Sequence, residues 1–399
     1  MAVEERPVHI LAAIAATISA VEWYSRQSRG GAPSSQRLEG LETGEYWTTT
    51  VLADEQLLFD YTRCRPETFN YLLEYLEKAS PPLTSGRRIS SSQKLLLFLH
   101  MCATGAHFRI IRGVFQISLA TVSSCFHEVL QGLCTLYLNE VKDPDDKVPR
   151  QVANDPKRMP FFKDCIGALD GSHIHAHITG EQAPYRNRKG YLSQNVLAVV
   201  NFDGNFTRIL AGWEGSAHDG RVFNSAREKG FDAPPSRYYL ADAGYYNSAI
   251  TMVPYRGIRY HLREQAAAQQ RPANAKELFN LRHASLRNAV ERAFGVFKRR
   301  FQILDHAPQF DIDTQVELIY ALAALHNLLN RLQGPDQSDF YNYDSDNVEA
   351  TDEDLNESTQ QKDRRREESK EMTARRDRIA EEMWISYQAM LRARGGEVE

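Results

Sequence analysis

Three acidic residues stand where the fold could hold their carboxylates on rigid elements. Asp170 ends the apolar run 165–169 and is followed by a glycine, and Asp242 ends the run 238–241. An acid at the exit of a buried strand lies at the sheet edge where ligands bind. Glu291 lies among apolar residues of an expected helix, where a carboxylate is poorly hydrated unless a cation pairs with it.

Carboxylates that converge from distant parts of a chain repel one another, and a divalent cation relieves that repulsion. Mg²⁺ prefers hard oxygen ligands in octahedral geometry. Two such ions, about 3.5–4 Å apart, can activate a water or a 3′-hydroxyl and stabilise the leaving oxygen of a phosphodiester. Asp170, Asp242 and Glu291 therefore predict a site for two Mg²⁺ or Mn²⁺ ions, although a single strand-end aspartate can also be only a turn or helix cap.

Two alternatives for the metal site stay open. Asp219 begins an expected helix, where it would cap the helix or bind metal; we favour Asp242 because it ends a strand. His173, His175 and His177 alternate along the chain, so on a strand they would share one face and could bind zinc. Zinc sites of this kind need further ligands, so we expect instead a histidine packed beside the acids.

Short β-rich runs and two later helical patterns predict an α/β domain that positions these acids. Asp203 and Gly204 form a strong hairpin signal between the second and third runs. The expected strands are 165–169, 196–202, 206–213 and 238–241, and the expected helices are 281–301 and 316–332, the second ended by Gly334 and Pro335.

Composition shifts divide the chain into four regions. Residues 1–42 hold an apolar stretch, 10–21, that is too short to span a bilayer and lacks the basic flank of a signal peptide. We expect it to form a short amphipathic or buried helix, followed by a flexible linker at 30–35. Residues 43–148 are helical in pattern, and 149–334 form the α/β domain. Residues 335–399 form an acidic and charged tail that we expect to be partly disordered, with a terminal helix that needs a partner.

The tail is expected to serve partner binding, nuclear retention through Arg364, Arg365 and Arg366, or self-inhibition. Because the helix 316–332 supplies what looks like the last long apolar face, we expect the catalytic core to fold without everything after Gly334.

Residues 108–133 have the pattern of a helix-turn-helix. The first helix would be 108–115, and Ser118 would cap a second helix that runs through Leu130. Thr121 and Ser124 would then be polar contacts in the major groove. The second helix carries no arginine or lysine, so a plain helical subdomain packed on the core is the alternative.

Two basic runs in the α/β region could neutralise phosphates without reading base sequence. The second run also closes the helix of Glu291, where the helix dipole favours cations. The residues expected to bind DNA in this way are Arg186, Arg188, Lys189, Lys298, Arg299 and Arg300.

The bulk composition is that of an ordinary soluble globular protein, with 42% hydrophobic and 25% charged residues. The net charge of −4 neither supports nor excludes nucleic-acid binding, because an acidic tail can mask a basic core. Five cysteines without CxxC spacing argue against a disulfide framework and a zinc finger, and indicate a reducing compartment.

Six ordered motifs resemble the PIF/Harbinger group of DDE transposases, whose domesticated members are called Harbinger-derived nucleases. The motifs are GALDGSHI (167–174), RKGYLSQNV (188–196), GSAHDGRVF (215–223), YLADAGY (239–245), LFNLRHASLRN (278–288) and ERAFGVFKRRF (291–301), and ALHN (324–327) also fits. The 48 residues between Asp242 and Glu291 are typical of the group, and they hold an apparent insertion at 250–275.

The resemblance implies an RNase H-like catalytic core with the triad Asp170, Asp242 and Glu291, preceded by an all-α helix-turn-helix-like domain. It further implies metal-dependent DNA cleavage and strand transfer in the nucleus, a Myb-like DNA-binding partner protein and a homodimer. Two other functions compete: a domesticated, catalytically silent DNA- or protein-binding module, and a metal-dependent hydrolase of small phosphate esters. A hydrolase would need a compact pocket, whereas the basic runs suit a polymer.

Overall fold

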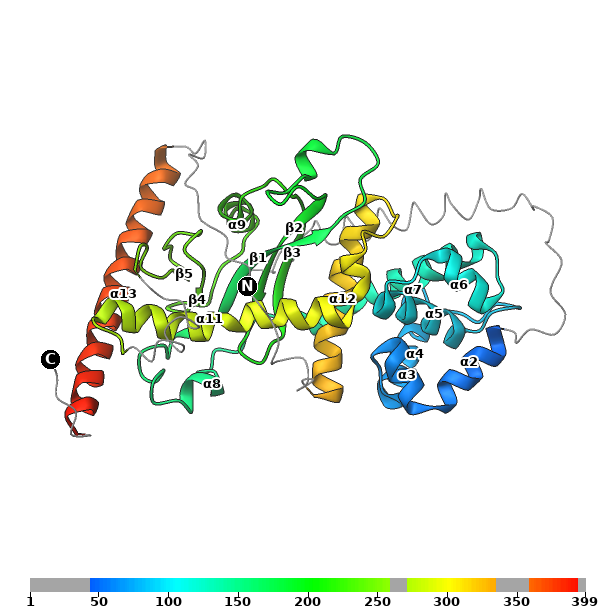
Figure 1. Cartoon of the computed structure of the whole chain (residues 1–399), viewed down its shortest axis with the longest axis horizontal. Coiled ribbons are helices and arrows are strands. Elements are labelled where there is room, and N and C mark those ends of the chain that lie inside the picture. The colour runs from blue at the N-terminus through cyan, green and yellow to red at the C-terminus, as the bar shows by residue number, and fades with distance from the viewer. Residues whose placement is uncertain (1–43, 259–270, 335–358, 394–399) are drawn as a thin grey trace, which may run out of the picture.

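The computed structural model describes residues 44–258, 271–334 and 359–393 (Figure 1). The expected N-terminal helix at 10–21 and the acidic run at the start of the tail lie outside the described residues. Among the described residues, no helix is long and apolar enough to cross a membrane.

A five-stranded mixed sheet forms the centre of the α/β region. Its strand order is β3-β2-β1-β4-β5, in which β1 pairs antiparallel with β2 and parallel with β4. The pair β2–β3 is antiparallel and the pair β4–β5 is parallel. The strands are β1 (Cys165–His175), β2 (Ser193–Val200), β3 (Phe206–Glu214), β4 (Tyr238–Leu240) and β5 (Thr251–Met252).

The four predicted strands are therefore confirmed, and β5 was missed. The hairpin between β2 and β3 is also confirmed, with Gly204 at a φ of 82°. The side chain of Asn201 holds this turn by accepting hydrogen bonds from the backbone N–H groups of Asp203 and Asn205, each 3.0 Å long. The short β5 lies inside the region 250–275, so the front of that apparent insertion belongs to the core.

Helices cover both faces of the sheet (Figure 1). On one face, α11 (Ala275–Arg300) and α12 (Ile312–Gln333) pack on side chains such as Ala168 and Val196. On the other face, α9 (Asp219–Glu228) packs through Phe223 on Leu169 and Val199. The alternation of side chains along a strand explains why neighbouring residues of β1 belong to different clusters.

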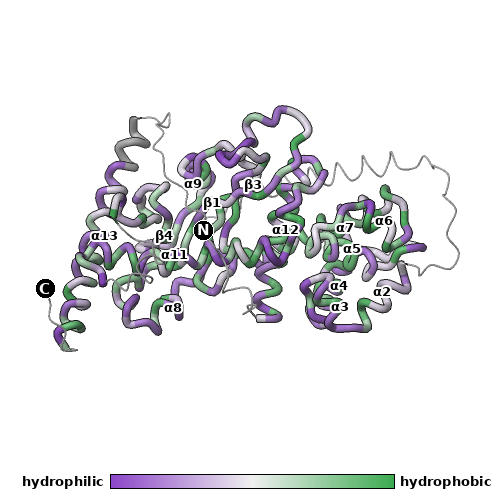
Figure 2. The backbone as a smooth tube through the Cα atoms, viewed as in Figure 1, coloured by the Kyte–Doolittle hydropathy of each residue, from purple (hydrophilic) through white to green (hydrophobic). Residues whose placement is uncertain are grey.

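The N-terminal region is all α-helical. Its helices are α2 (Gly44–Ala53), α3 (Glu55–Thr62), α4 (Pro66–Glu77), α5 (Ser91–Thr104), α6 (Phe108–Phe115) and α7 (Leu119–Glu140). The short α8 (Arg150–Ala153) follows them and belongs to the α/β region (Figure 1). Local signals set their starts: Ser90 and Gln93 form a capping box before α5, and Pro66 occupies the first turn of α4. Figure 2 shows the hydrophobic residues that α5, α6 and α7 contribute.

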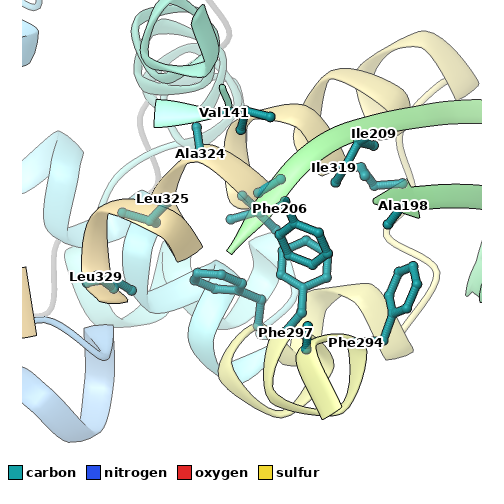
Figure 3. Close-up of a cluster of buried hydrophobic side chains, with 14 of the residues drawn as sticks. Val141, Ala198, Phe206, Ile209, Phe294, Phe297, Ile319, Ala324, Leu325 and Leu329 are labelled. Atoms are coloured by element: carbon teal, nitrogen blue, oxygen red, sulfur yellow. The ribbon is translucent and has the colours of Figure 1, made fainter. Parts of the chain in front are cut away.

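The helical region shares one hydrophobic cluster with the α/β region. Figure 3 shows Val141, just after α7, near Phe206 of β3 and Ala324 of α12, all within this cluster. Polar contacts reinforce the junction: the Asn327 side chain accepts a hydrogen bond from the Phe206 N–H (2.9 Å) and donates one to the Glu140 carbonyl (3.0 Å). The two expected regions are thus packed into one continuous core.

The two helices of the expected helix-turn-helix are present. Between α6 and α7, Gln116 has a φ of 51°, and the Ser118 side chain caps α7 by accepting from the Thr121 N–H at 3.1 Å. However, α7 ends at Glu140 rather than near Leu130, and its second half is buried against α5 and α12. The first turns of α7, which include the exposed Ser124, lie at the surface, as does Asn139 near its end.

The charged tail contains a long helix, α13 (Thr359–Ala393), that packs on the α/β region. The expectation that the terminal helix needs a partner protein to bury its apolar face is therefore not met. Although Figure 2 shows α13 as largely hydrophilic, one stripe is buried against α11 and β5, and includes Met372, Ile379 and Met383. Arg375 forms an ion pair with Asp164 at 2.7 Å. The expectation that the apolar faces of the core end at Gly334 is therefore wrong.

Candidate active site

Two carboxylates leave neighbouring parallel strands at the same edge of the sheet. Ala168 of β1 is in register with Leu240 of β4, so Asp170 and Asp242 each follow two residues later along their chains. Local backbone groups orient both: the N–H of Gly171 donates to Asp170 Oδ1 (2.9 Å), and the N–H of Gly244 donates to Asp242 Oδ1 (2.8 Å). Asp242 follows the end of β4, as predicted, whereas the prediction that Asp170 ends a strand is wrong: β1 continues to His175, because its pairing with β2 extends past the point where its pairing with β4 stops.

The third acid reaches this edge from α11. Arg287 lies one helical turn before Glu291, and its guanidinium pairs with Glu291 Oε1 through Nη2 and with Asp170 Oδ2 through Nη1, the second contact at 2.9 Å. The three side chains are largely buried, at 16% exposed for Arg287, 19% for Asp170 and 17% for Glu291. The helix α11 thus brings Glu291 to Asp170 through a shared cation.

A fourth carboxylate, Asp219, faces the acids from the opposite side of β1. It is the first residue of α9, and its Oδ1 accepts a hydrogen bond of 2.8 Å from Asn195 of β2. Its position depends on Gly171: a β-carbon there would lie 2.2 Å from Asp219 Oδ1. The structure therefore groups Asp219 with the other acids rather than leaving it as a helix cap.

Mutual repulsion among these carboxylates affects Asp170 most clearly. Burial raises the pKa of Asp170 well above its usual range, Arg287 opposes that rise, and the nearby charges of Asp242, Asp219 and Glu291 add to it. Asp170, Glu291 and Asp242 lie near the guanidinium of Arg287, whereas Asp219 lies near His218 and Arg188. Positive charge near these groups favours their ionised forms, because an opposite charge stabilises a carboxylate.

Tyr245 adds a neutral hydroxyl to the site. Its side chain is fully buried, and its hydroxyl has no hydrogen-bond partner among the described residues. Burial raises its pKa, and the charges of Asp219, Asp170 and Asp242 raise it further, so the group stays a hydrogen-bond donor near the acids. A buried donor without a protein partner is rare and indicates a place for a bound oxygen.

The ligand types fit Mg²⁺ or Mn²⁺, because four carboxylates and a hydroxyl supply only hard oxygen atoms. In their present arrangement, however, the described residues include no group of three acids, histidines or cysteines that could hold a metal ion. The guanidinium of Arg287 engages two of the three predicted ligands, Asp170 and Glu291.

The histidines do not form the alternative zinc site. His173 and His175 lie in β1 and His177 follows it, and no three ligands converge in the described parts of the chain. His173 approaches Ser193 Oγ at 3.1 Å, and burial followed by the charges of Lys298 and two other cations lowers its pKa to about 4. The charged groups that act on His173 are thus cations rather than the acids.

The first basic run lies next to the acidic site. The Arg188 guanidinium approaches His218 Nδ1 at 2.6 Å, and His218 directly precedes Asp219. Arg188 and Lys189 are exposed, and so is Arg186, which donates to the Gly190 carbonyl at 2.6 Å. This loop therefore presents positive charge beside Asp219.

The second basic run is mostly structural, which corrects part of the expectation for DNA binding. Arg300 is only 7% exposed and contacts His326 Nδ1 at 2.9 Å and Asn330 Oδ1 at 3.1 Å. Lys298 is partly buried and donates to the His173 carbonyl at 2.8 Å. Arg300 packs inside the fold because α11 ends against α12, so it cannot neutralise phosphate.

Sequence reasoning missed three residues of this site: Arg287, Asn195 and Tyr245. Arg287 could have been found from its spacing, because residues four apart on a helix share a face and Arg287 precedes Glu291 by four. No sequence pattern indicated that Asn195 would reach Asp219, since that contact depends on how α9 packs on β2.

Replacing Gly171 by alanine is expected to destabilise the protein by about 1–3 kcal/mol, because the new β-carbon forces Asp219 or β1 to move. Urea unfolding measures this change. Gly113→Ala in α6 is the matched control, since nothing lies within 4 Å of its β-carbon position. Equal stability of the two variants would show that Asp219 is not held against β1.

Comparison with known proteins agrees with this geometry. Residues 169–327 match the family described as DDE superfamily endonuclease, a span that includes all four carboxylates. Residues 40–135 match a family described only as a domain of unknown function. No solved structure matches the chain.

Curated relatives extend the match beyond the catalytic region. The Homo sapiens protein named "Putative nuclease HARBI1" is 25% identical over 286 residues, which cover 69% of this chain and 78% of that protein. The Arabidopsis thaliana protein named "Protein ALP1-like" is 21% identical over 290 residues, covering 66% and 68% of the two chains. Residues 169–327 therefore form a DDE superfamily endonuclease domain, and the chain is similar to proteins named as a Harbinger-derived nuclease and as ALP1-like, which supports a relationship with the Harbinger-derived nucleases.

Proposed function

We propose that the protein is a transposase-derived endonuclease or transposase that cleaves DNA phosphodiester bonds, and joins strands, with the help of two Mg²⁺ or Mn²⁺ ions. The observation that carries the proposal is the convergence of Asp170, Asp242 and Glu291 at one edge of the sheet. Three elements that are distant in sequence supply these acids, and a shared guanidinium links two of them.

The strand order supports an RNase H-like core for this site. Three antiparallel strands followed by two parallel strands place β1 in the centre, so Asp170 lies on the central strand and Asp242 on its parallel neighbour. Hydrogen bonds within the sheet hold the backbone near both acids in place. Such rigidity matters because catalytic ligands must keep their positions to within a fraction of an ångström.

The position of each side chain suggests its role in the reaction. Asp170, Asp242 and Glu291 would hold the ions, and Asp219 would orient them or complete the ligand set. Bound ions would activate the attacking oxygen and stabilise the leaving one. The Tyr245 hydroxyl would donate a hydrogen bond to an oxygen in the site, which the acids cannot do.

DNA would approach along the basic loop beside the acids. Arg186, Arg188 and Lys189 would neutralise phosphates, and Thr121 and Ser124 at the start of α7 would contact the groove if α6 and α7 act as a helix-turn-helix-like unit. Terminal repeats and a target site as substrates, a Myb-like partner protein, a homodimer and a nuclear location complete the proposal by analogy with the family.

A catalytically silent binding module is the second candidate, and one observation favours it. Arg287 is paired with two of the three acids, so the site as it stands holds a side-chain cation where a metal would bind. A silent module would retain DNA or protein binding without turnover.

A nicking assay on supercoiled plasmid separates these functions. We expect nicking in Mg²⁺ or Mn²⁺, binding with little turnover in Ca²⁺, and no hydrolysis of a small aryl phosphate ester. DNA binding without nicking in any of these metals would support the silent module. Nicking that requires tightly bound zinc would contradict the carboxylate site and favour a histidine site.

Neutralising the exposed basic loop should weaken DNA binding about equally on any sequence. For Arg188→Gln with Lys189→Gln, the slope of log affinity against log salt should fall by roughly 1.8, or about 0.9 for each lost phosphate contact. Arg300→Gln is the contrasting variant, expected to lower thermal stability but to leave the slope unchanged, because Arg300 is buried. An unchanged slope in the loop variant would show that the loop does not touch phosphate.

A further inference from the structure

We infer that Arg287 is a resting counter-ion of the carboxylate site and that a divalent cation must displace its guanidinium in order to bind. The inference rests on the proposed function, because it concerns the same metal site. It assigns to Arg287 a regulatory role that follows from its contacts in the absence of metal.

The guanidinium fits this role by its geometry. Nη1 donates to Asp170 Oδ2 at 2.9 Å, while Nη2 pairs with Glu291 Oε1. Two donors on one planar group thus engage two acids, one from β1 and one from α11. Charge-assisted hydrogen bonds of this kind are roughly twice as strong as neutral ones, so the bridge holds the two acids in place without metal.

The charges around Arg287 make it a substitute for a metal ion. Burial alone would lower the pKa of Arg287, but Asp170, Glu291 and Asp242 raise it, so the carboxylates hold the group as a cation. An arginine side chain does not lose its proton in proteins. The guanidinium therefore cannot give up its charge when a metal arrives, and it must move away.

Competition between the two cations follows from the same contacts. The bridge occupies one oxygen of Asp170 and one of Glu291 that an ion would need, and a divalent charge beside the guanidinium would repel it. While the bridge is formed, these two oxygens are engaged by the guanidinium, so the apparent metal affinity falls in proportion to the fraction of molecules in which the bridge is open. Removing the guanidinium should remove that penalty.

Mn²⁺ binding to the full-length protein tests the inference, with free Mn²⁺ measured by electron paramagnetic resonance. Arg287→Gln should bind Mn²⁺ at least about tenfold more tightly than the wild type, equal to about 1.4 kcal/mol. In EDTA the same variant should melt at a lower temperature than the wild type, since its acids lack a counter-ion, and Mn²⁺ should raise its melting temperature by more than that of the wild type.

Arg282→Gln is the matched control on the same helix. Its guanidinium lies over the Phe161 ring, 5.5 Å from the centroid, and is half-buried away from the acids. The control should leave the Mn²⁺ affinity unchanged. Asp170→Asn identifies the site, because Mn²⁺ binding there should be lost.

The outcomes separate this inference from the proposed function. If the wild type binds Mn²⁺ through Asp170 but Arg287→Gln binds equally or more weakly, the counter-ion role is wrong and the metal site stands. If neither protein binds Mn²⁺, both are wrong. If Arg287→Gln does not fold in EDTA, recovery of folding in Mn²⁺ supports the inference, whereas failure in both conditions overturns it.

Discussion

Conversion of Asp170, Asp242 or Glu291 to its amide is expected to lower plasmid nicking by about 10³-fold or more while the protein stays folded. An amide keeps the shape of each side chain but removes the negative charge that holds a divalent ion, and loss of one preorganised electrostatic group at a reaction centre costs about this much. Initial nicking rates in Mg²⁺, with circular dichroism to confirm folding, give the measurement.

Asp219→Asn should lower the nicking rate less, by about 10–100-fold. Asp219 is hydrogen-bonded to Asn195 on the other face of β1, so it would act on the metal site only from its edge. Asp203→Asn, an exposed acid in the β2–β3 turn, is the surface control. Should Asp242→Asn nick at the wild-type rate while Asp219→Asn is inactive, Asp219 is the second acid.

Disrupting the packing of α13 is expected to cost several kcal/mol of unfolding free energy. Met383→Asp would place a carboxylate at a fully buried position against the α/β region, where an unpaired charge is strongly unfavourable. Ile385→Asp is the matched control, because that side chain is 60% exposed on the same helix and its replacement should change stability by no more than about 0.5 kcal/mol. Truncation after Gly334 should have at least the effect of Met383→Asp.

Denaturant unfolding with both variants and the truncated chain gives the comparison. If the truncated chain unfolds at the same denaturant concentration as the full chain, α13 is dispensable, and the core ends at Gly334 as the sequence pattern suggested. If Met383→Asp lowers the free energy of unfolding but truncation after Gly334 does not, a misplaced α13 destabilises the protein although the core folds without the helix.

The difference between sequence and structure at α13 has a simple cause. Its buried residues Met372, Ile379 and Met383 are spaced at seven and four, a helical repeat that could have been recognised. The surrounding run of arginine, glutamate and lysine concealed that stripe, because a high charged fraction is also typical of disorder. A pattern of periodicity can reveal such a face, but only the structure shows that β5 and α11 cover it.

The acids were predictable for the opposite reason. Asp170 and Asp242 each follow an apolar run, and the rule that ligands bind at strand ends needs no tertiary contact. The rule holds for Asp242, whereas β1 continues past Asp170 to His175 because the polar residues there pair with β2. Arg300 shows where reasoning from sequence fails. Lys298, Arg299 and Arg300 are adjacent basic residues that the sequence does not distinguish, but only the side chain of Arg300 points toward α12 and is buried there. Likewise β5, two residues long, leaves too little alternation to be recognised.

The central claim is that Asp170 holds a catalytic metal ion, and a change of ligand atom tests it most directly. Asp170→Cys replaces a hard oxygen ligand by sulfur, which binds Mg²⁺ poorly but accepts softer ions. Nicking by this variant should be lost in Mg²⁺ and regained at least in part in Mn²⁺, while the wild type nicks in both. Nicking by Asp170→Cys in Mg²⁺ at the wild-type rate would contradict the account, because the side chain at position 170 could then not be a metal ligand of the reaction.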